Sequence, residues 1–198
     1  GLEISGNTIS DTYGGIYAEY FDEVTIRGNT IKGSYMHDKG VYLYYCDGAN
    51  VVEDNTIYAP DMGYGIYLYY CQATSGNEAT IVNNLISVED YGIYMYQYNT
   101  YQNVYYNSVK VRDSNALYYH SNNDQFDSKN NIFYSASSAS PALYVYNSTG
   151  FTGNYNDLFS NYTYPVYYSG NQTFTEYQAT GNGANSVNLE PVFDSDST

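Results

Sequence analysis

Three aspartates at matching positions are the residues best suited to acid–base or metal chemistry in this chain. Asp61, Asp90 and Asp113 each lie six residues after an Asn that opens a recurring phrase. Carboxylates brought together could bind calcium, which prefers oxygen ligands, or could hold an acid whose pKa is raised by its neighbours. The alternative, which we favour, is three solvated turn residues with Arg112 as a nearby counter-charge. We therefore expect no cofactor, with calcium as the one candidate metal.

The two cysteines are candidates for a disulfide. Cys46 and Cys71 lie 25 residues apart, and each follows a Tyr-Tyr pair. Residues at equivalent positions of stacked strands have Cα atoms about 5 Å apart, a separation that a disulfide accepts. A bridge would join one repeat to the next in an oxidising compartment. Two reduced thiols stacked at a strand end are the alternative.

The two histidines are expected on the surface and not as metal ligands. His37 and His120 fall in different repeats, as do the arginines Arg27 and Arg112. These residues therefore form no convergent set of catalytic groups. His120 takes a position that tyrosine occupies in other repeats, at Tyr44, Tyr69, Tyr96 and Tyr146.

Tyrosine supplies 30 of the 198 residues and forms the clearest candidate binding surface. In the strand-like phrase Gly65-Ile66-Tyr67-Leu68-Tyr69-Tyr70, alternation places residues 66, 68 and 70 on one side and Tyr67 and Tyr69 on the other. The outward tyrosines of all repeats define two columns, which we call the tyrosine face: Tyr17, Tyr42, Tyr67, Tyr94, Tyr118, Tyr144 and Tyr167 in the first, and Tyr44, Tyr69, Tyr96 and Tyr146 in the second.

Two interpretations of the tyrosine face are open. Stacked aromatic residues stabilise a sheet by about 0.2 to 1 kcal/mol per neighbour contact, so the columns could be purely structural. An aromatic surface roughly 30 Å long is also larger than a monomer usually exposes, which favours an interaction site. Tyrosine rings can stack on the C–H face of a sugar while their hydroxyls bond its oxygens. A neutral glycan is therefore the favoured ligand, with a protein surface as the other candidate.

These positions recur because the chain itself is a repeat. An Asn-containing phrase returns every 22 to 29 residues, and a second phrase, an aliphatic residue followed by Tyr, returns with it. Alternating apolar residues surround both phrases, and no apolar stripe of helical spacing persists long enough to support a helix. The recurring asparagines are Asn7, Asn29, Asn55, Asn84, Asn107, Asn131 and Asn156.

A unit of about 25 residues cannot bury its own apolar face, so neighbouring units must stack into a solenoid. We predict an all-β chain of about seven coils with the asparagines in a hydrogen-bonded column. A leucine-rich repeat would fit the period, but Leu is scarce and the return segment carries a second β pattern. The apolar column that the stacking predicts is Ile9, Ile31, Ile57, Ile86, Val109, Phe133 and Leu158.

Short repeats such as Asn7-Thr8-Ile9 and Asn29-Thr30-Ile31 resemble those of the right-handed parallel β-helix proteins, the pectate-lyase-like superfamily, over residues 1 to about 170. The resemblance implies a right-handed parallel β-helix over residues 1–174 and a terminal coil or tail over 175–198. It extends to repeat regions of bacterial secreted or cell-surface proteins, which implies an extracellular location. Residues 1–4 already lie inside a repeat, so we expect a segment of a longer solenoid.

The charge of the chain excludes several partners. Six Lys and Arg residues against 21 Asp and Glu residues give a net charge of −15. Nucleic acids and anionic membrane surfaces need many cationic contacts, and no apolar run is long enough to insert in a membrane. We therefore expect a non-catalytic, adhesin-like module that binds a neutral glycan or a protein through the tyrosine face, with self-association through that face or the open coil ends as a further option. The alternatives are a fragment of a polysaccharide lyase or hydrolase and a structural stalk.

Overall fold

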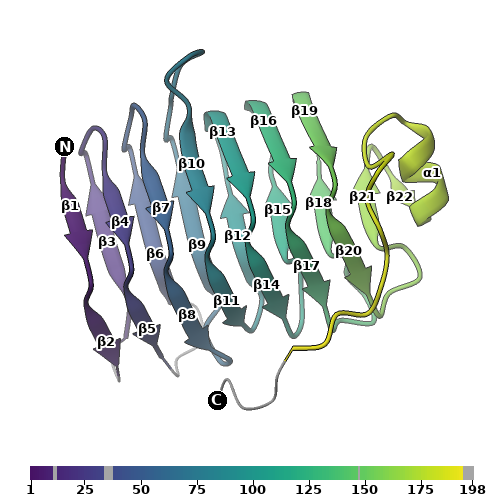
Figure 1. The fold of residues 1–198 in the computed structure, drawn as a ribbon, viewed down its shortest axis with the longest axis horizontal. Helices are drawn as coiled ribbons and strands as arrows, with labels where there is room; N and C mark the ends of the chain where they lie inside the picture. Colours follow the sequence, from purple (N-terminus) through teal and green to yellow (C-terminus); the bar gives the residue numbers. More distant parts are fainter. Residues whose placement is uncertain (11–12, 34–37, 147, 194–198) are drawn as a thin grey trace.

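The computed structural model of the chain describes residues 1–10, 13–33, 38–146 and 148–193. Over these residues the backbone winds as a parallel β-helix in which each coil contributes one strand to each of three sheets, A, B and C. Figure 1 shows the coils side by side, with the strands of sheets A and B toward the viewer and those of sheet C behind them. The prediction of an all-β solenoid of about seven coils is confirmed.

Sheet A holds the first strand of each coil, and all neighbours in it are parallel. Its strands are β1 (Glu3–Ser5), β4 (Thr25–Arg27), β7 (Val51–Glu53), β10 (Ala79–Val82), β13 (Thr100–Tyr105), β16 (Asn123–Lys129) and β19 (Ser148–Asn154). Sheet B, also parallel, follows directly in each coil. Its strands are β2 (Thr8–Ser10), β5 (Thr30–Lys32), β8 (Thr56–Ala59), β11 (Leu85–Val88), β14 (Ser108–Val111), β17 (Ile132–Ser135) and β20 (Asp157–Ser160).

Sheet C completes each coil and carries the tyrosine face. Its parallel strands are β3 (Ile16–Glu19), β6 (Lys39–Tyr44), β9 (Tyr64–Tyr69), β12 (Tyr91–Met95), β15 (Leu117–Tyr119), β18 (Leu143–Val145) and β21 (Val166–Tyr168), and β22 (Asn171–Gln172) adds one antiparallel strand at the end. Alternate residues of these strands point inward. In β9, for example, Ile66 and Leu68 are buried and Tyr67 and Tyr69 are half-buried on the outer side.

The predicted asparagine column lies at the corner between sheets A and B. The backbone N–H and the Nδ2 of Asn55 both donate to Oδ1 of Asn84 at 3.0 Å, and Asn84 donates in the same way to Asn107 at 2.9 Å. These buried amides therefore satisfy the polar groups of a backbone that bends inside the protein. The residue before each asparagine has a positive φ, which makes the bend: Gly6, Gly28, Asp54, Asn83, Tyr106, Asn130 and Tyr155.

The predicted apolar column fills the interior behind sheet B. Strand pairing places Ile57 opposite Ile31 and Ile86 opposite Ile57, and these three side chains are fully buried. Sheet C approaches this column closely at a glycine in several coils. A Cβ atom at Gly65 would lie 2.5 Å from Cγ2 of Ile86, so the narrow interior has no room for a side chain at that position.

The expectation that the chain contains no helix is wrong at one place. Helix α1 spans Phe174–Ala179 and lies against β21 and β22 at the end of sheet C. Thr173 accepts a hydrogen bond from the N–H of Glu176, whose carboxylate accepts the N–H of Thr173. Such a capping box depends on two residues three positions apart, a signal that a search for apolar stripes does not detect. No helix in the described part of the chain is long and apolar enough to cross a membrane.

The chain after α1 turns back along the solenoid, as the yellow trace in Figure 1 shows. The hydroxyl of Ser186 accepts the N–H of Asn156 at 3.0 Å and so takes the place of a further asparagine in the column. Val187 bonds the backbone of the last coil, and the N–H of Leu189 donates to Asp157 at 2.9 Å. Residues after the predicted boundary at 174 thus form a helix and an extended tail, which crosses the outer side of sheet B.

Candidate functional site

The first column of the tyrosine face is a continuous ladder of rings. Strand pairing aligns each tyrosine with the equivalent tyrosine of the next coil, from Tyr17 to Tyr167. The distance between ring centroids falls along the ladder, from 5.6 Å for Tyr17 and Tyr42 to 4.2 Å for Tyr144 and Tyr167. The angle between ring planes falls with it, from 80° to 6°. The ladder therefore changes from edge-to-face contacts to parallel stacking, two arrangements that aromatic rings favour.

The second column lies beside the first and includes the predicted histidine. Tyr69 lies between Tyr44 and Tyr96, with centroid distances of 5.3 Å to each. His120 follows at 4.9 Å from Tyr96 and continues the column to Tyr146 at 5.9 Å. Burial lowers the pKa of His120, so the neutral ring is favoured in the folded protein. His37 lies outside the described residues.

A third column, at the corner between sheets C and A, is absent from the sequence prediction. It contains Tyr20, Tyr45, Tyr70 and Tyr98, each with a positive φ between 50° and 61°. Tyr70 stacks on Tyr45 at 4.6 Å and contacts Tyr98 at 4.5 Å with the ring planes tilted by 30°. The expectation that Tyr70 points to the same side as Ile66 and Leu68 is therefore wrong, because the left-handed backbone turns its ring out of the strand alternation. The recurring Tyr-Tyr pair is the feature of the sequence that could have indicated this third column.

A short fourth column borders the face on its other side. Tyr64 and Tyr91 stack at 5.3 Å, and Lys39 is the paired residue in the preceding coil. The Nζ of Lys39 lies 4.8 Å from the ring centroid of Tyr42 and 5.3 Å from that of Tyr67, within the range of a cation–π interaction. The aromatic surface is thus up to four columns wide in its central coils. We call this wider set, with the tyrosine face at its centre, the extended tyrosine face.

Burial holds several phenol groups of the extended tyrosine face in their neutral form. Burial raises the pKa of Tyr42 to about 12, and the nearby Tyr44 adds to the shift. Burial likewise raises the pKa of Tyr118 to about 12, with Tyr144 as the second cause. A phenolate would lose solvation and would repel other phenolates in the same ladder. The hydroxyls of Tyr42 and Tyr118 therefore stay available as both hydrogen-bond donors and acceptors.

The structure does not bring the three aspartates of the predicted carboxylate column together in one cluster. Arg112 bonds Asp113 through Nε at 3.0 Å and Asp61 through Nη1 at 3.2 Å, so a cation from the protein already lies between these carboxylates. Asp90 lies elsewhere, near Tyr64: burial raises the pKa of that tyrosine, and Tyr91 and Asp90 add to the shift. In the described part of the chain, no group of three or more acidic, His or Cys residues could hold a metal ion. The turn-residue interpretation, with Arg112 as the counter-charge, fits this arrangement.

A third carboxylate, which was not predicted, completes the Arg112 cluster. Glu89 bonds the Nη2 of Arg112, and only 11% of its side chain is exposed. Its Oε2 has no hydrogen-bond partner among the described residues. Arg112 also donates to the carbonyl of Pro60 at 3.1 Å. The guanidinium is therefore fully engaged in joining three consecutive coils.

The cysteines occupy equivalent positions in consecutive coils, as the sequence predicts. Both are buried free thiols. Cys46 donates to the carbonyl of Ala18 at 3.2 Å and Cys71 to that of Leu43 at 3.5 Å, while the N–H of Cys71 donates to Oδ1 of Asn99 at 3.0 Å. The cysteines thus begin a second polar ladder, at the corner between sheets C and A, that Asn99 and later Asn123 continue.

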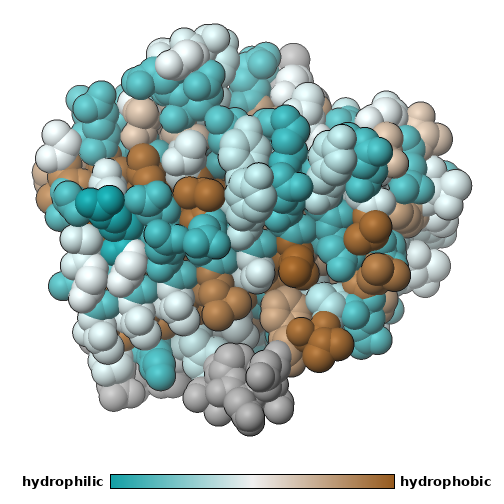
Figure 2. Space-filling model, viewed as in Figure 1, coloured by the Kyte–Doolittle hydropathy of each residue, from teal (hydrophilic) through white to brown (hydrophobic). Residues whose placement is uncertain are grey.

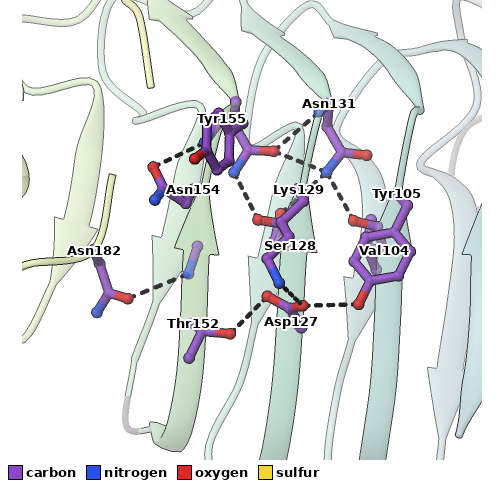
Figure 3. A network of polar contacts seen from close by, with 12 residues as sticks. Val104, Tyr105, Asp127, Ser128, Lys129, Asn131, Thr152, Asn154, Tyr155 and Asn182 are labelled. Carbon is purple, nitrogen blue, oxygen red and sulfur yellow. Dashed lines mark hydrogen bonds and ion pairs between the residues drawn. The ribbon is translucent and has the colours of Figure 1, made fainter. Parts of the chain in front are cut away.

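A polar network on sheet A surrounds Asp127, as Figure 3 shows. Its carboxylate accepts hydrogen bonds from the hydroxyl of Tyr105 at 2.7 Å, the Nζ of Lys129 at 2.5 Å and the hydroxyl of Thr152 at 2.6 Å. Burial opposes the charge, but the three donors outweigh it and lower the pKa of Asp127. All of these partners come from the protein itself, so the carboxylate of Asp127 joins the three strands β13, β16 and β19.

The fold agrees with a comparison with known protein families. A sequence model described as a right handed beta helix region matches residues 14–183. No curated protein and no solved structure matches the chain. The matched residues include all 20 strands from β3 to β22, together with α1. The chain therefore belongs to the right-handed β-helix family.

Proposed function

We propose that this β-helix is a non-catalytic, adhesin-like module of a secreted or cell-surface protein, and that it binds a neutral glycan through the extended tyrosine face. The observation that carries the proposal is the continuity of the aromatic surface, in which Tyr17 and Tyr167 belong to one ladder across all seven coils. Exposed aromatic surfaces of this extent are typical of interaction sites.

A long, uncharged and repetitive ligand fits this surface best. The raised pKa values keep the phenols neutral, and the net charge of −15 opposes an anionic polymer along the solenoid. Consecutive coils repeat about every 4.8 Å, so the hydroxyls recur at a spacing close to that of sugar residues in an extended chain. Tyrosine contributes this contact area at a low cost in conformational entropy.

The ring geometry predicts how the glycan would be held. Tyr144 lies between the parallel rings of Tyr118 at 4.6 Å and Tyr167 at 4.2 Å, so both of its faces are covered. Only ring edges and hydroxyls can contact a ligand there. At the other end the rings of Tyr17 and Tyr42 meet at 80°, and 48% of Tyr17 is exposed. Hydrogen bonds would therefore dominate at the late coils, and stacking on sugar rings at the first coils.

Binding to a panel of neutral and acidic polysaccharides tests this proposal. We expect the native chain to bind a neutral polymer without cleaving it, and the triple variant Tyr44→Ala, Tyr69→Ala, Tyr96→Ala to bind at least about tenfold more weakly. The matched control is Tyr106→Ala, which removes an exposed ring at the opposite corner. Equal binding by the triple variant and the native chain would refute the proposal, and bond cleavage would support the lyase or hydrolase alternative instead.

A second triple variant separates the two ways of holding the sugar. Replacing Tyr118, Tyr144 and Tyr167 with Phe keeps the stacked rings and removes only their hydroxyls. If hydroxyls hold the glycan at these coils, this variant should lose affinity while its thermal stability stays close to that of the native chain. The same change at Tyr17 and Tyr42 should have a smaller effect, because the ring faces contribute there.

A further inference from the structure

The outer side of sheet B carries a hollow that the extended tyrosine face does not include. It has a volume of about 620 Å³, which is in the range of small-molecule sites. Its floor is formed by outward residues of β8, β11 and β14, and Pro60 and Arg112 close one side. The end of the described chain, at Phe193, closes another. The hollow thus lies between the coils and the returning tail.

One small residue creates the hollow. Strand pairing aligns Lys32, Tyr58, Ser87, Lys110 and Tyr134 in one outward column. Ser87 is the only short side chain among these five, so it leaves a gap between Tyr58 and Lys110. Phe193 stacks on Tyr134 at 5.9 Å and holds the tail against the column. Figure 2 shows brown, hydrophobic side chains interrupting the hydrophilic surface in the lower part of this face.

The charged residues that line the hollow are all basic, although the chain as a whole is acidic. The protein has only six Lys and Arg residues, and three of them, Lys32, Lys110 and Arg112, line this one hollow. Arg112 is engaged by carboxylates, but Lys32 and Lys110 form no ion pair with a described residue. They lie three coils apart, which is roughly 14 Å at strand spacing. An otherwise acidic surface therefore presents two cations without a carboxylate partner among the described residues, one on either side of an apolar floor. The Nζ of Lys110 lies 5.7 Å from the ring centroid of Phe193.

We propose that this hollow binds a small organic anion with an apolar body, such as an aryl or alkyl carboxylate or sulfonate. The ammonium group of Lys110 would pair with the anionic group, and Lys32 would add positive potential from the far side of the floor. Tyr58, Leu85 and Phe193 would cover the apolar body. Leu85 is 41% exposed and Phe193 belongs to the tail, so both can contact a ligand that enters from solvent. The surrounding negative potential would keep large polyanions away while a single small anion enters.

Fluorescence titration with 1-anilinonaphthalene-8-sulfonate tests the proposal, with N-phenyl-1-naphthylamine as the matched neutral probe. We expect the anionic probe to bind the folded chain at one site and the neutral probe to bind more weakly. Lys110→Gln should raise the Kd of the anionic probe at least about fivefold. Lys39→Gln is the control, since it removes the same charge beside the extended tyrosine face.

A variant that keeps every charge provides an independent check. Ser87→Tyr places a ring in the gap between Tyr58 and Lys110 and should abolish binding of the anionic probe. The replaced side chain points outward, so far-ultraviolet circular dichroism and the Tm should match those of the native chain. Three results would each overturn the proposal: unchanged binding by Ser87→Tyr, equal Kd values for the two probes, or an equal loss of binding in Lys39→Gln and Lys110→Gln.

Discussion

The rings of Tyr144 and Tyr167 lie parallel, with 6° between their planes and 4.2 Å between their centroids. Tyr17 and Tyr42, at the other end of the same ladder, meet at 80° and 5.6 Å. Parallel strands fix only the spacing of the coils, so the difference arises from how each ring rotates against its neighbours. The same residue type therefore presents ring faces at one end of the ladder and hydroxyl-bearing edges at the other.

Alkaline pH should unfold the protein cooperatively. The folded pKa of Tyr42 and of Tyr118 is about 12, above the usual value near 10, because burial disfavours the phenolate. The folded state then holds protons that the unfolded state releases, so stability is fully present below pH of about 10 and is lost as the pH rises through about 12. Tyrosinate absorbance, followed together with circular dichroism, should contain a component that rises only as the structure is lost. A tyrosinate signal that is already complete at the usual tyrosine pKa, before any unfolding, would contradict this.

Removing one amide from the asparagine column should be costly. Asn84→Ala leaves the backbone N–H and the Nδ2 of Asn55 without their acceptor inside the protein. Since each unsatisfied buried polar group costs about 1 to 3 kcal/mol, we expect the free energy of unfolding to fall by about 2 to 4 kcal/mol. Urea denaturation measures the loss, with Asn77→Ala, in an exposed turn, as the control. Equal stability of the two variants would show that the column is dispensable.

The Cys71 thiol should be unreactive in the folded protein. Burial raises its pKa to about 12, so very little thiolate exists at neutral pH. Alkylation under native conditions should therefore be much slower than after denaturation, and Cys71 should stay reduced in mild oxidants. Mass spectrometry of the alkylated chain gives both rates. Rapid native labelling, or a Cys46–Cys71 disulfide in the purified protein, would disagree with the buried, reduced pair.

The Asp127 network should contribute stability that depends on pH. The donors from Lys129, Thr152 and Tyr105 outweigh burial and lower the folded pKa, so this stabilisation is present above the usual carboxyl pKa near 4 and is lost as the pH falls through the folded value. Thr152→Val removes one donor and should cost about 1 kcal/mol at neutral pH. The difference in Tm from the native chain should shrink in acid. A difference that is constant with pH would assign the effect to packing alone.

The repeated pattern predicts the fold because the same constraint acts in every coil. Each unit must align Asn with Asn and Ile with Ile to bury its apolar side, so one register satisfies all seven units. The two central tyrosine columns follow from the same alignment. The tyrosines with positive φ, such as Tyr70, do not follow, because strand alternation says nothing about a residue that leaves the strand.

The repeat period does not predict the charged clusters, because these clusters depend on contacts between residues that lie far apart in the sequence. Arg112 reaches Asp61 across 51 positions of sequence, and Glu89 joins them from the coil between. Asp61, Asp90 and Asp113 were grouped because each lies six residues after an asparagine. The loops after sheet B differ in length, however, and this difference separates Asp90 from the other two aspartates. The hollow over Ser87 likewise depends on the tail, whose path is set by its bonds to the last coil.

The asparagine column also has a direction, because the backbone N–H of each of Asn29, Asn55, Asn84 and Asn107 donates to the side-chain oxygen of the asparagine in the following coil. One coil can therefore be removed or added while the hydrogen bonds of the column are kept. Excising the 29 residues from Asn55 to Asn83 would join Asp54, already in a left-handed conformation, to Asn84 and leave every amide with a partner. Gene duplication or deletion of one repeat can thus lengthen or shorten the aromatic surface by one whole coil.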